Sequence, residues 1–208
     1  MMFSKIEEAI NDIKRGKFVI VVDDESRENE GDLVLAAEKV TAERINYMIK
    51  NARGLVCMPI VKERLEKLGI PPMVNHNEIN RCMFSISVDY KNGTTTGISP
   101  SDRAETIKAL IDNKTNNEHL IMPGHLFPLI YKEGGVLVRE GHTEASVDLA
   151  KLAGLYPAAV ICEIINEDGN MAKLTDLEEF SKKHNNMKLI SIADLIEHIK
   201  NNPIGTVE

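Results

Sequence analysis

Apolar side chains recur along the chain at two different spacings. Residues 6–13 carry them at the spacing of an amphipathic helix, Ser4 and Glu7 resemble a capping box at its start, and Gly16 follows as a stop signal. The next segment, 18–22, is a short continuous apolar run, which is typical of a buried strand. The pattern therefore predicts an N-terminal helix followed by a strand.

The rest of the chain continues this alternation. Strands are predicted at 33–36, 55–60, 84–88, 136–138 and 158–165. Helices are predicted to start at Thr41, at Ser99-Pro100 and, last in the chain, at a capping box formed by Thr175 and Glu178. Two further helices are predicted over 61–68, which Gly69 and Pro71 end, and over 144–152. Residues 201–208 are predicted to form a solvated tail. No linker or repeat separates these elements, so the pattern predicts one α/β or α+β domain with a mixed sheet and helices on its faces.

Composition narrows the class of protein. The 208 residues, of which 43% are hydrophobic, are enough to build a large core. With 32 acidic and 25 basic residues the net charge is -7, which disfavours a nucleic-acid partner. No segment approaches the ~20 apolar residues of a membrane span, and the three cysteines form no C-x-x-C pair. We therefore expect a cytoplasmic protein with reduced thiols and no membrane partner.

An acidic run follows the first predicted strand. Residues 23–32 contain six carboxylates in ten positions, and their mutual repulsion requires an opposing charge. A hard divalent cation such as Mg²⁺ would supply it through oxygen ligands. The alternative is a solvated charged turn, which is the usual fate of a charge run. Arg27 within the run, Gly31, and the buried strands on either side favour a functional loop.

Two further segments carry candidate chemistry. In residues 139–144, Thr143 is predicted to cap a helix whose exposed N–H groups, together with Arg139, would bind a phosphate; the alternative is a capped helix with a merely exposed His142. Pro123-Gly124-His125 places a histidine after a turn. Glu163 interrupts an otherwise apolar strand, which is costly unless the carboxylate is paired, protonated or bound to a ligand. Cys57 is interpreted as a small core residue.

Taken together, these segments closely resemble one enzyme family. The matching pieces are DDESRENEGDLVLAAE (23–38), GLVCMPI (54–60), FSISVD (84–89), GTTTGISPSDRAETI (93–107), PGHLFPL (123–129) and GGVLVREGHTEASVDLAKLAGLYPAAVICEIINEDGNMA (134–172). The chain is identified from them as similar to 3,4-dihydroxy-2-butanone 4-phosphate synthase, the riboflavin-pathway lyase that converts D-ribulose 5-phosphate to L-3,4-dihydroxy-2-butanone 4-phosphate and formate. The resemblance implies a single α+β domain over 1–208, with no GTP cyclohydrolase domain, acting as a homodimer with active sites near the subunit interface.

The resemblance also implies a set of site residues. Glu28 and His142 would hold the metal, normally Mg²⁺, as a pair of ions bridged by Glu28, and Mn²⁺ is expected to substitute because histidine is a softer ligand than Mg²⁺ prefers. His125 and Glu163 match the catalytic positions. The substrate-binding residues would be Arg27, Glu28, Asp32, Arg139, Glu140, Gly141, His142, Thr143 and Glu163. The other acids of the run, Asp23, Asp24, Glu25 and Glu30, are expected to shape or hydrate the loop.

The implied reaction agrees with this inventory of side chains. Removal of the C3 proton needs a base, the resulting enediolate needs a cation, and dehydration, skeletal rearrangement and loss of C4 need further proton transfers without redox chemistry. Which acid performs each transfer stays open. Three alternatives make different predictions: a ketose-phosphate isomerase or aldolase would release no formate, a nucleotide- or RNA-binding module would carry basic patches, and a metal-buffering protein would not need Glu163.

Overall fold

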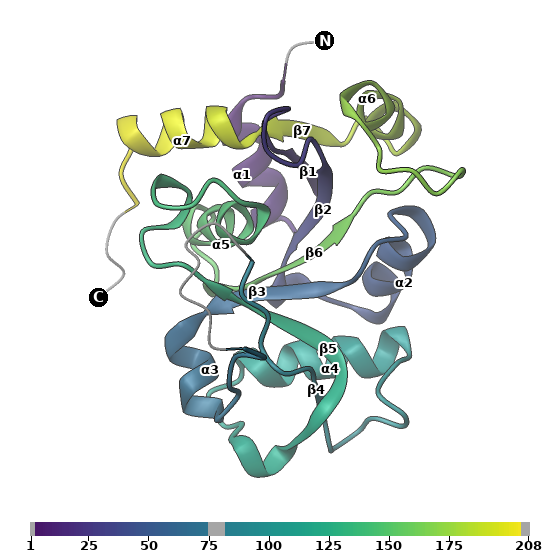
Figure 1. The fold of residues 1–208 in the computed structure, drawn as a ribbon, viewed down its shortest axis with the longest axis vertical. Helices are drawn as coiled ribbons and strands as arrows, with labels where there is room; N and C mark the ends of the chain where they lie inside the picture. Colours follow the sequence, from purple (N-terminus) through teal and green to yellow (C-terminus); the bar gives the residue numbers. More distant parts are fainter. Residues whose placement is uncertain (1–2, 75–81, 205–208) are drawn as a thin grey trace.

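Seven strands form one mixed sheet in the computed structural model, which describes residues 3–74 and 82–204. Their spatial order is β4-β5-β3-β6-β2-β1-β7 (Figure 1). The strands are β1 (Val19–Val22), β2 (Gly31–Ala36), β3 (Cys57–Val61), β4 (Val88–Tyr90), β5 (Leu120–Tyr131), β6 (Ala159–Glu163) and β7 (Lys188–Ser191). β1 with β7 and β3 with β5 are parallel, and the other neighbouring pairs are antiparallel. The predicted α+β class with a mixed sheet is confirmed.

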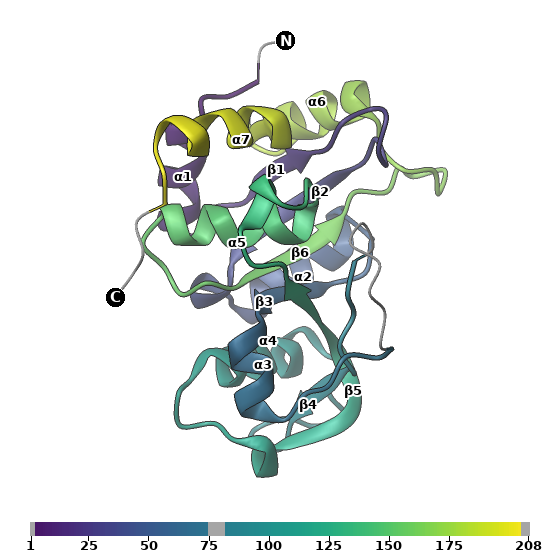
Figure 2. The ribbon, with the colours of Figure 1, turned by 60° about the vertical axis from the view of Figure 1, so that its left-hand side comes forward.

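Helices cover both faces of the sheet (Figure 2). They are α1 (Ile6–Lys14), α2 (Ala42–Asn51), α3 (Lys62–Leu68), α4 (Pro100–Ile111), α5 (His142–Leu152), α6 (Leu174–Lys183) and α7 (Ile192–Asn201), with short 3-10 turns at Ala37–Lys39, Asn117–His119 and Gly135–Leu137. One apolar cluster joins α1, α5 and α7 to the sheet, and the other joins α2, α3, α4 and α6. No helix in the described ranges is long and apolar enough to cross a membrane.

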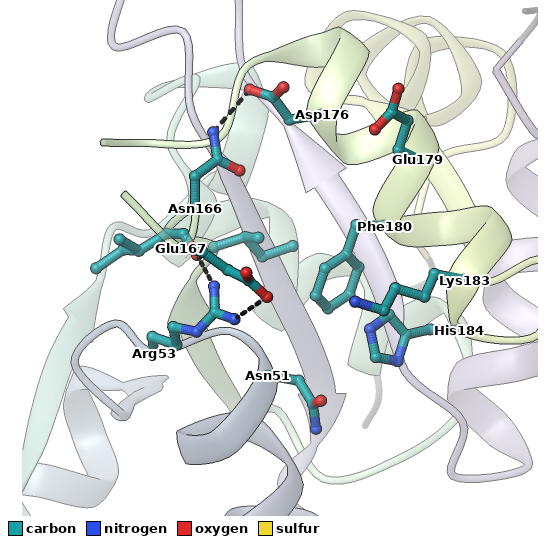
Figure 3. A pocket seen from close by; sticks show the side chains of 11 residues that line it. Asn51, Arg53, Asn166, Glu167, Asp176, Glu179, Phe180, Lys183 and His184 are labelled. Carbon is teal, nitrogen blue, oxygen red and sulfur yellow. Dashed lines mark hydrogen bonds and ion pairs between the residues drawn. The ribbon is translucent and has the colours of Figure 1, made fainter. Parts of the chain in front are cut away.

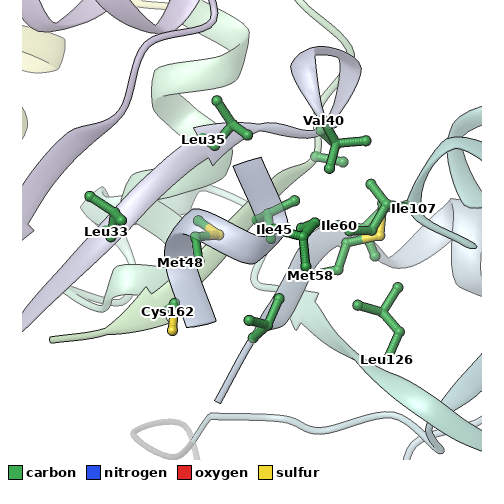
Figure 4. Packing of buried hydrophobic residues seen from close by; sticks show 14 of the residues in the cluster. Leu33, Leu35, Val40, Ile45, Met48, Met58, Ile60, Ile107, Leu126 and Cys162 are labelled. Carbon is green, nitrogen blue, oxygen red and sulfur yellow. The ribbon is translucent and has the colours of Figure 1, made fainter. Parts of the chain in front are cut away.

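Alternation along the central strands divides the core into these two clusters. Ile20 and Val22 belong to the cluster on the α2 side, whereas Val19 and Val21 belong to the cluster on the α5 side. β2 and β6 divide in the same way, and Figure 4 shows Leu33, Leu35 and Cys162 packed with Ile45 and Met48 of α2. Because β1 and β2 are buried on both faces, they appear in the sequence as continuous apolar runs rather than as alternating patterns.

Local capping signals correctly placed several helix ends. The hydroxyl of Thr41 accepts a hydrogen bond from Arg44 N at the start of α2, and Ser99 Oγ accepts one from Asp102 N at the start of α4. Gly69 ends α3 in the left-handed conformation, with φ of 67°.

Other helix ends differ from the sequence prediction. Ser4 does not cap α1, because its backbone pairs with Leu189 of β7 and its Oγ accepts from Leu189 N at 3.3 Å. The cap residue of the last predicted helix is Lys173, two positions before the predicted Thr175, so α6 begins at Leu174. The backbone N–H of Lys173 donates to Asp176 Oδ2. β7 and α7, which follow it, were not predicted; α7 extends to Asn201, and residues 205–208 of the predicted tail lie outside the described ranges.

Two predicted strands were wrong in extent or type. Residues 136–138 lie mostly in a 3-10 turn, because Gly134 and Gly135 adopt positive φ and Asp148 captures the N–H of Val136. In the 84–88 segment only Val88 begins a strand. Ser85 and Ser87 are buried together with Val88, whereas Phe84 and Ile86 are half-buried, so burial does not follow the predicted alternation.

The long strand β5 was not predicted at all. Pro123 and Gly124 suggest a turn, yet both lie inside this strand, which pairs with β4 and β3. Gly124 N donates to Ser87 O and lies within reach of Ser87 Oγ, and a Cβ at Gly124 would overlap the backbone of Val88. His125 is therefore a strand residue rather than the residue after a turn.

Candidate active site

The acidic loop between β1 and β2 is organised around the buried side chain of Asp23. Its Oδ2 accepts hydrogen bonds from Glu28 N at 3.1 Å and from Arg27 Nη1 at 2.8 Å, and its Oδ1 accepts one from Glu30 N at 2.8 Å. Arg27 also pairs with the carboxylate of Glu28. The run is thus a folded loop held by one carboxylate, which agrees with the shaping role expected of Asp23.

Asp23, Glu28 and His142 converge on one position. One ligand atom from each lies within 4.8 Å of the others, and Glu28 Oε2 is 3.9 Å from His142 Nδ1. His142 is buried at the first position of α5, and its Nε2 has no hydrogen-bond partner among the described residues. The structure thus brings together the two predicted metal ligands, and Asp23 joins them.

These side chains fit a divalent cation. Burial lowers the pKa of His142, so the imidazole is neutral, which is the form that binds a metal. The carboxylate of Glu28 and the imidazole of His142 are donors that Mg²⁺ or a first-row divalent ion accepts, and the nearby carboxylate of Asp23 adds negative charge. An unpartnered nitrogen on a buried ring is also explained by coordination, since buried polar atoms otherwise find hydrogen bonds.

Asp32 and Glu163 are cross-strand partners on β2 and β6, at the same end of the sheet. Burial, reinforced by the negative charge of Glu163, raises the pKa of Asp32 well above its usual value. Glu163 Oε2 accepts a hydrogen bond from Leu55 N at 2.8 Å. Gly54 lies so close to Glu163 that a Cβ there would overlap its carboxylate and backbone. The carboxylate in the apolar strand is therefore held by the backbone of the segment before β3.

The start of α5 carries the predicted anion-binding segment. Arg139 is buried, its Nη1 donates to Glu144 Oε2 at 2.6 Å, and its Nε has no hydrogen-bond partner in the described ranges. Thr143 is not the helix cap, since α5 begins at His142 with Gly141 as the cap residue. The Thr143 hydroxyl instead lies 3.5 Å from Cys82 Sγ. Glu140, also in the predicted set, is exposed.

His125 is oriented by a residue that sequence reasoning did not single out. Its Nδ1 lies 2.7 Å from Asp89 Oδ2, and its backbone N–H donates to Asp89 Oδ1 at 2.9 Å. The imidazole side chain is 44% exposed. No hydrogen bond or ion pair in the described part of the chain joins it to the acidic loop or to Glu163. Asp89 is the last residue of the FSISVD segment. The one feature of the sequence that could have indicated a role for Asp89 is its place as a polar residue directly after the predicted strand 84–88.

Two other observations bound the site. Burial raises the pKa of the Cys57 thiol, which agrees with its interpretation as a core residue. A separate pocket, shown in Figure 3, contains none of the predicted site residues; Arg53 Nη1 donates to Ile165 O on one side of it, and Asn166 bonds Asp176 on another.

Comparisons with known proteins agree with this geometry. The family model for 3,4-dihydroxy-2-butanone 4-phosphate synthase matches residues 7–198. The chain is 58% identical over 199 residues to riboflavin biosynthesis protein RibBA of Aquifex aeolicus (strain VF5), covering 94% of this chain and 49% of the relative. It is 55% identical over 198 residues to RibBA of Endomicrobium trichonymphae, covering 95% and 49%. The chain thus spans about half the length of these curated relatives.

Solved structures are similar over nearly the whole chain. A 3,4-dihydroxy-2-butanone 4-phosphate synthase in complex with two magnesium ions superposes with a TM-score of 0.90 at 39% identity, covering 96% of this chain and 98% of that one. The two-domain synthase RibBX from A. baumannii gives a TM-score of 0.91 at 51% identity, covering 96% and 59%. As its motifs predicted, the chain belongs to the 3,4-dihydroxy-2-butanone 4-phosphate synthase family.

Proposed function

We propose that this protein converts D-ribulose 5-phosphate to L-3,4-dihydroxy-2-butanone 4-phosphate and formate, with Mg²⁺ bound by Glu28 and His142. The observation that carries the proposal is the convergence of His142 with Glu28 and Asp23 at the start of α5, three residues after Arg139. His142 Nδ1 lies 3.9 Å from Glu28 Oε2, and its buried Nε2 has no hydrogen-bond partner among the described residues. Membership of the synthase family supports it. The carbon lost as formate leaves without a change in overall oxidation state, so no redox cofactor is needed.

A bound divalent cation would supply positive charge that stabilises negative charge on substrate oxygen atoms. Glu28 bridging two ions, and Mn²⁺ replacing Mg²⁺, are parts of the same proposal. A related synthase that binds two magnesium ions supports the pair of ions. Asp23 has its oxygens committed to three donors of the loop, so we assign it the role of holding Glu28 in place.

Substrate recognition is assigned to residues around Glu28 and His142. Arg139 and the backbone of residues 140–143 would hold the phosphate, because N–H groups at a helix N-terminus and a guanidinium both favour an anion. Arg27 and Asp32 would contact the sugar.

Proton transfers are assigned to Asp32, Glu163 and His125. A carboxyl whose pKa is raised can hold a proton near neutral pH, which suits Asp32 as a proton carrier next to Glu163. Glu163 keeps one oxygen on Leu55 N, so the other oxygen can meet substrate. Asp89 fixes the ring of His125 through Nδ1 and leaves Nε2 for proton transfer.

Release of formate tests the proposal directly. The purified protein is incubated with D-ribulose 5-phosphate and Mg²⁺, and formate is measured against a chelator-treated control. Formate production that disappears with the chelator supports the proposal. Absence of formate, with substrate isomerised or cleaved to other products, would instead support a ketose-phosphate isomerase or aldolase.

We also propose that the protein acts in the cytoplasm as a homodimer whose second subunit covers His125. The exposed apolar side chains of Ile98, which follows the Gly97 turn beside His125, and of Ile121, which pairs with Asp89, support such a contact. Sedimentation measurements should give twice the monomer mass. A monomer at micromolar concentration with full activity would contradict this part of the proposal.

A further inference from the structure

Helix α5 carries two buried carboxylates one turn apart, and both bind the chain segment that leads to Arg139. Glu144 Oε1 accepts from Lys132 N at 3.1 Å, and its Oε2 accepts from Arg139 Nη1 at 2.6 Å. Asp148 accepts from Tyr131 OH and from Val136 N, each at 2.8 Å. The two side chains therefore attach residues 131–139 to α5 at four points.

The two carboxylates act on different parts of this segment. Among residues 3–74 and 82–204, the carboxylate of Asp148 accepts hydrogen bonds at the end of β5 and at the 3-10 turn, where Gly135 leaves room for it. Glu144 is the one that reaches the guanidinium of Arg139. Gly141 completes the arrangement, because a Cβ there would overlap Arg139 Nη1 and lie 3.0 Å from Glu144 Oε2.

We propose that Glu144 is a positioning residue that fixes the guanidinium of Arg139 for binding the substrate's phosphate. Glu144 and Arg139 form a buried ion pair, with side chains 1% and 8% exposed. Only one edge of the guanidinium is used by this pair, and its Nε has no partner among the described residues. The Glu144 carboxylate is itself fixed by Lys132 N, so it holds one edge of the guanidinium in a single orientation. This lowers the entropic cost of binding an anion on the other edge of the guanidinium. The inference rests on the proposed function and deepens it.

Glu144→Gln tests this with little change in shape. A glutamine offers one acceptor oxygen, so it cannot accept from Lys132 N and from Arg139 Nη1 together. Either Arg139 loses its acceptor, or the side chain loses the backbone bond that fixes it, and the negative charge beside the guanidinium is removed in both cases. KM for D-ribulose 5-phosphate should rise at least about tenfold while kcat changes by less than about threefold, and inorganic phosphate should bind correspondingly more weakly in calorimetry. If Glu144→Gln does not fold, Glu144→Asp, which keeps the charge but cannot reach both donors, is expected to raise KM in the same way.

Asp148→Asn is the matched control, because it removes an equally buried carboxylate one turn away whose hydrogen bonds in the described part of the chain go to Tyr131 and Val136 and not to Arg139. It should lower the melting temperature as Glu144→Gln does, with KM within about threefold of the original. Introducing Glu144→Gln into an Arg139→Ala background should raise KM no further, since the effect acts through Arg139.

Three results would overturn the inference. They are an unchanged KM in a folded Glu144 variant, an equal rise of KM in Asp148→Asn, and a further rise on top of Arg139→Ala. Failure of the proposed function gives a different result, namely no formate from the unaltered protein. Calorimetry with inorganic phosphate still tests the role of Glu144 in that case.

Discussion

Asp32→Asn should make the protein more stable and less active. Asp32 is 3% exposed, and burial together with the charges of Glu163, Glu30 and Glu28 raises its pKa well above the usual value. The ionised form is therefore disfavoured in the folded state relative to the unfolded chain. Asparagine has nearly the same shape and carries no charge, so the substitution removes this cost.

The magnitude follows from burial, and the pH window follows from linkage. Burial of a polar group without full compensation costs about 1–3 kcal/mol, so we expect Asp32→Asn to gain unfolding free energy of that order near neutral pH. Between the unfolded pKa of about 3.9 and the raised folded pKa, the folded state binds more protons than the unfolded state, so the original protein loses stability as pH rises. The gain should be small at about pH 4 and grow toward about pH 7.

Urea denaturation with a chelator present measures this difference, because a bound cation would offset the charge of Asp32. Asp24→Asn is the matched control in the same loop: Asp24 is exposed, hydrogen bonds from Ser26 lower its pKa, and its removal should give no gain. Formate release by Asp32→Asn should fall strongly. An Asp32→Asn protein that is no more stable than the original near neutral pH would refute the reasoning.

Three further substitutions test the rest of the site. Glu163→Gln keeps an acceptor for Leu55 N, so its circular dichroism and melting temperature should stay close to the original while formate release falls at least about 100-fold. His142→Ala should weaken Mg²⁺ or Mn²⁺ binding more than about tenfold in calorimetry, and unchanged metal affinity would remove His142 from the metal site. Gly54→Ala should cost about 1–3 kcal/mol in unfolding free energy and impair formate release, because its Cβ would overlap Glu163; a variant that matched the original in both measurements would contradict the close packing seen here.

Short-range signals in the sequence were sufficient where the physical cause is also short-range. Thr41 and Ser99 place the starts of α2 and α4, because a capping side chain bonds a backbone N–H only three residues away. The apolar run before the acidic loop predicted a buried strand correctly. Helices pack against β1 from both faces of the sheet, so each of its residues is apolar. Ser4 failed as a cap because β7, about 185 positions later, takes its hydroxyl instead.

The same distinction between short-range and long-range causes applies to the candidate site. Residue types and motifs alone gave the acidic loop, His142, Arg139 and Glu163 as candidates, because carboxylates, imidazole and guanidinium in such segments are chemically unusual. Only the tertiary structure decided which of them meet, since the pairing of Asp32 with Glu163 depends on the register of two strands far apart in the sequence. Packing likewise decided that Glu144 faces Arg139 and that Asp89 orients His125, because burial and register are properties of the assembled sheet and helices.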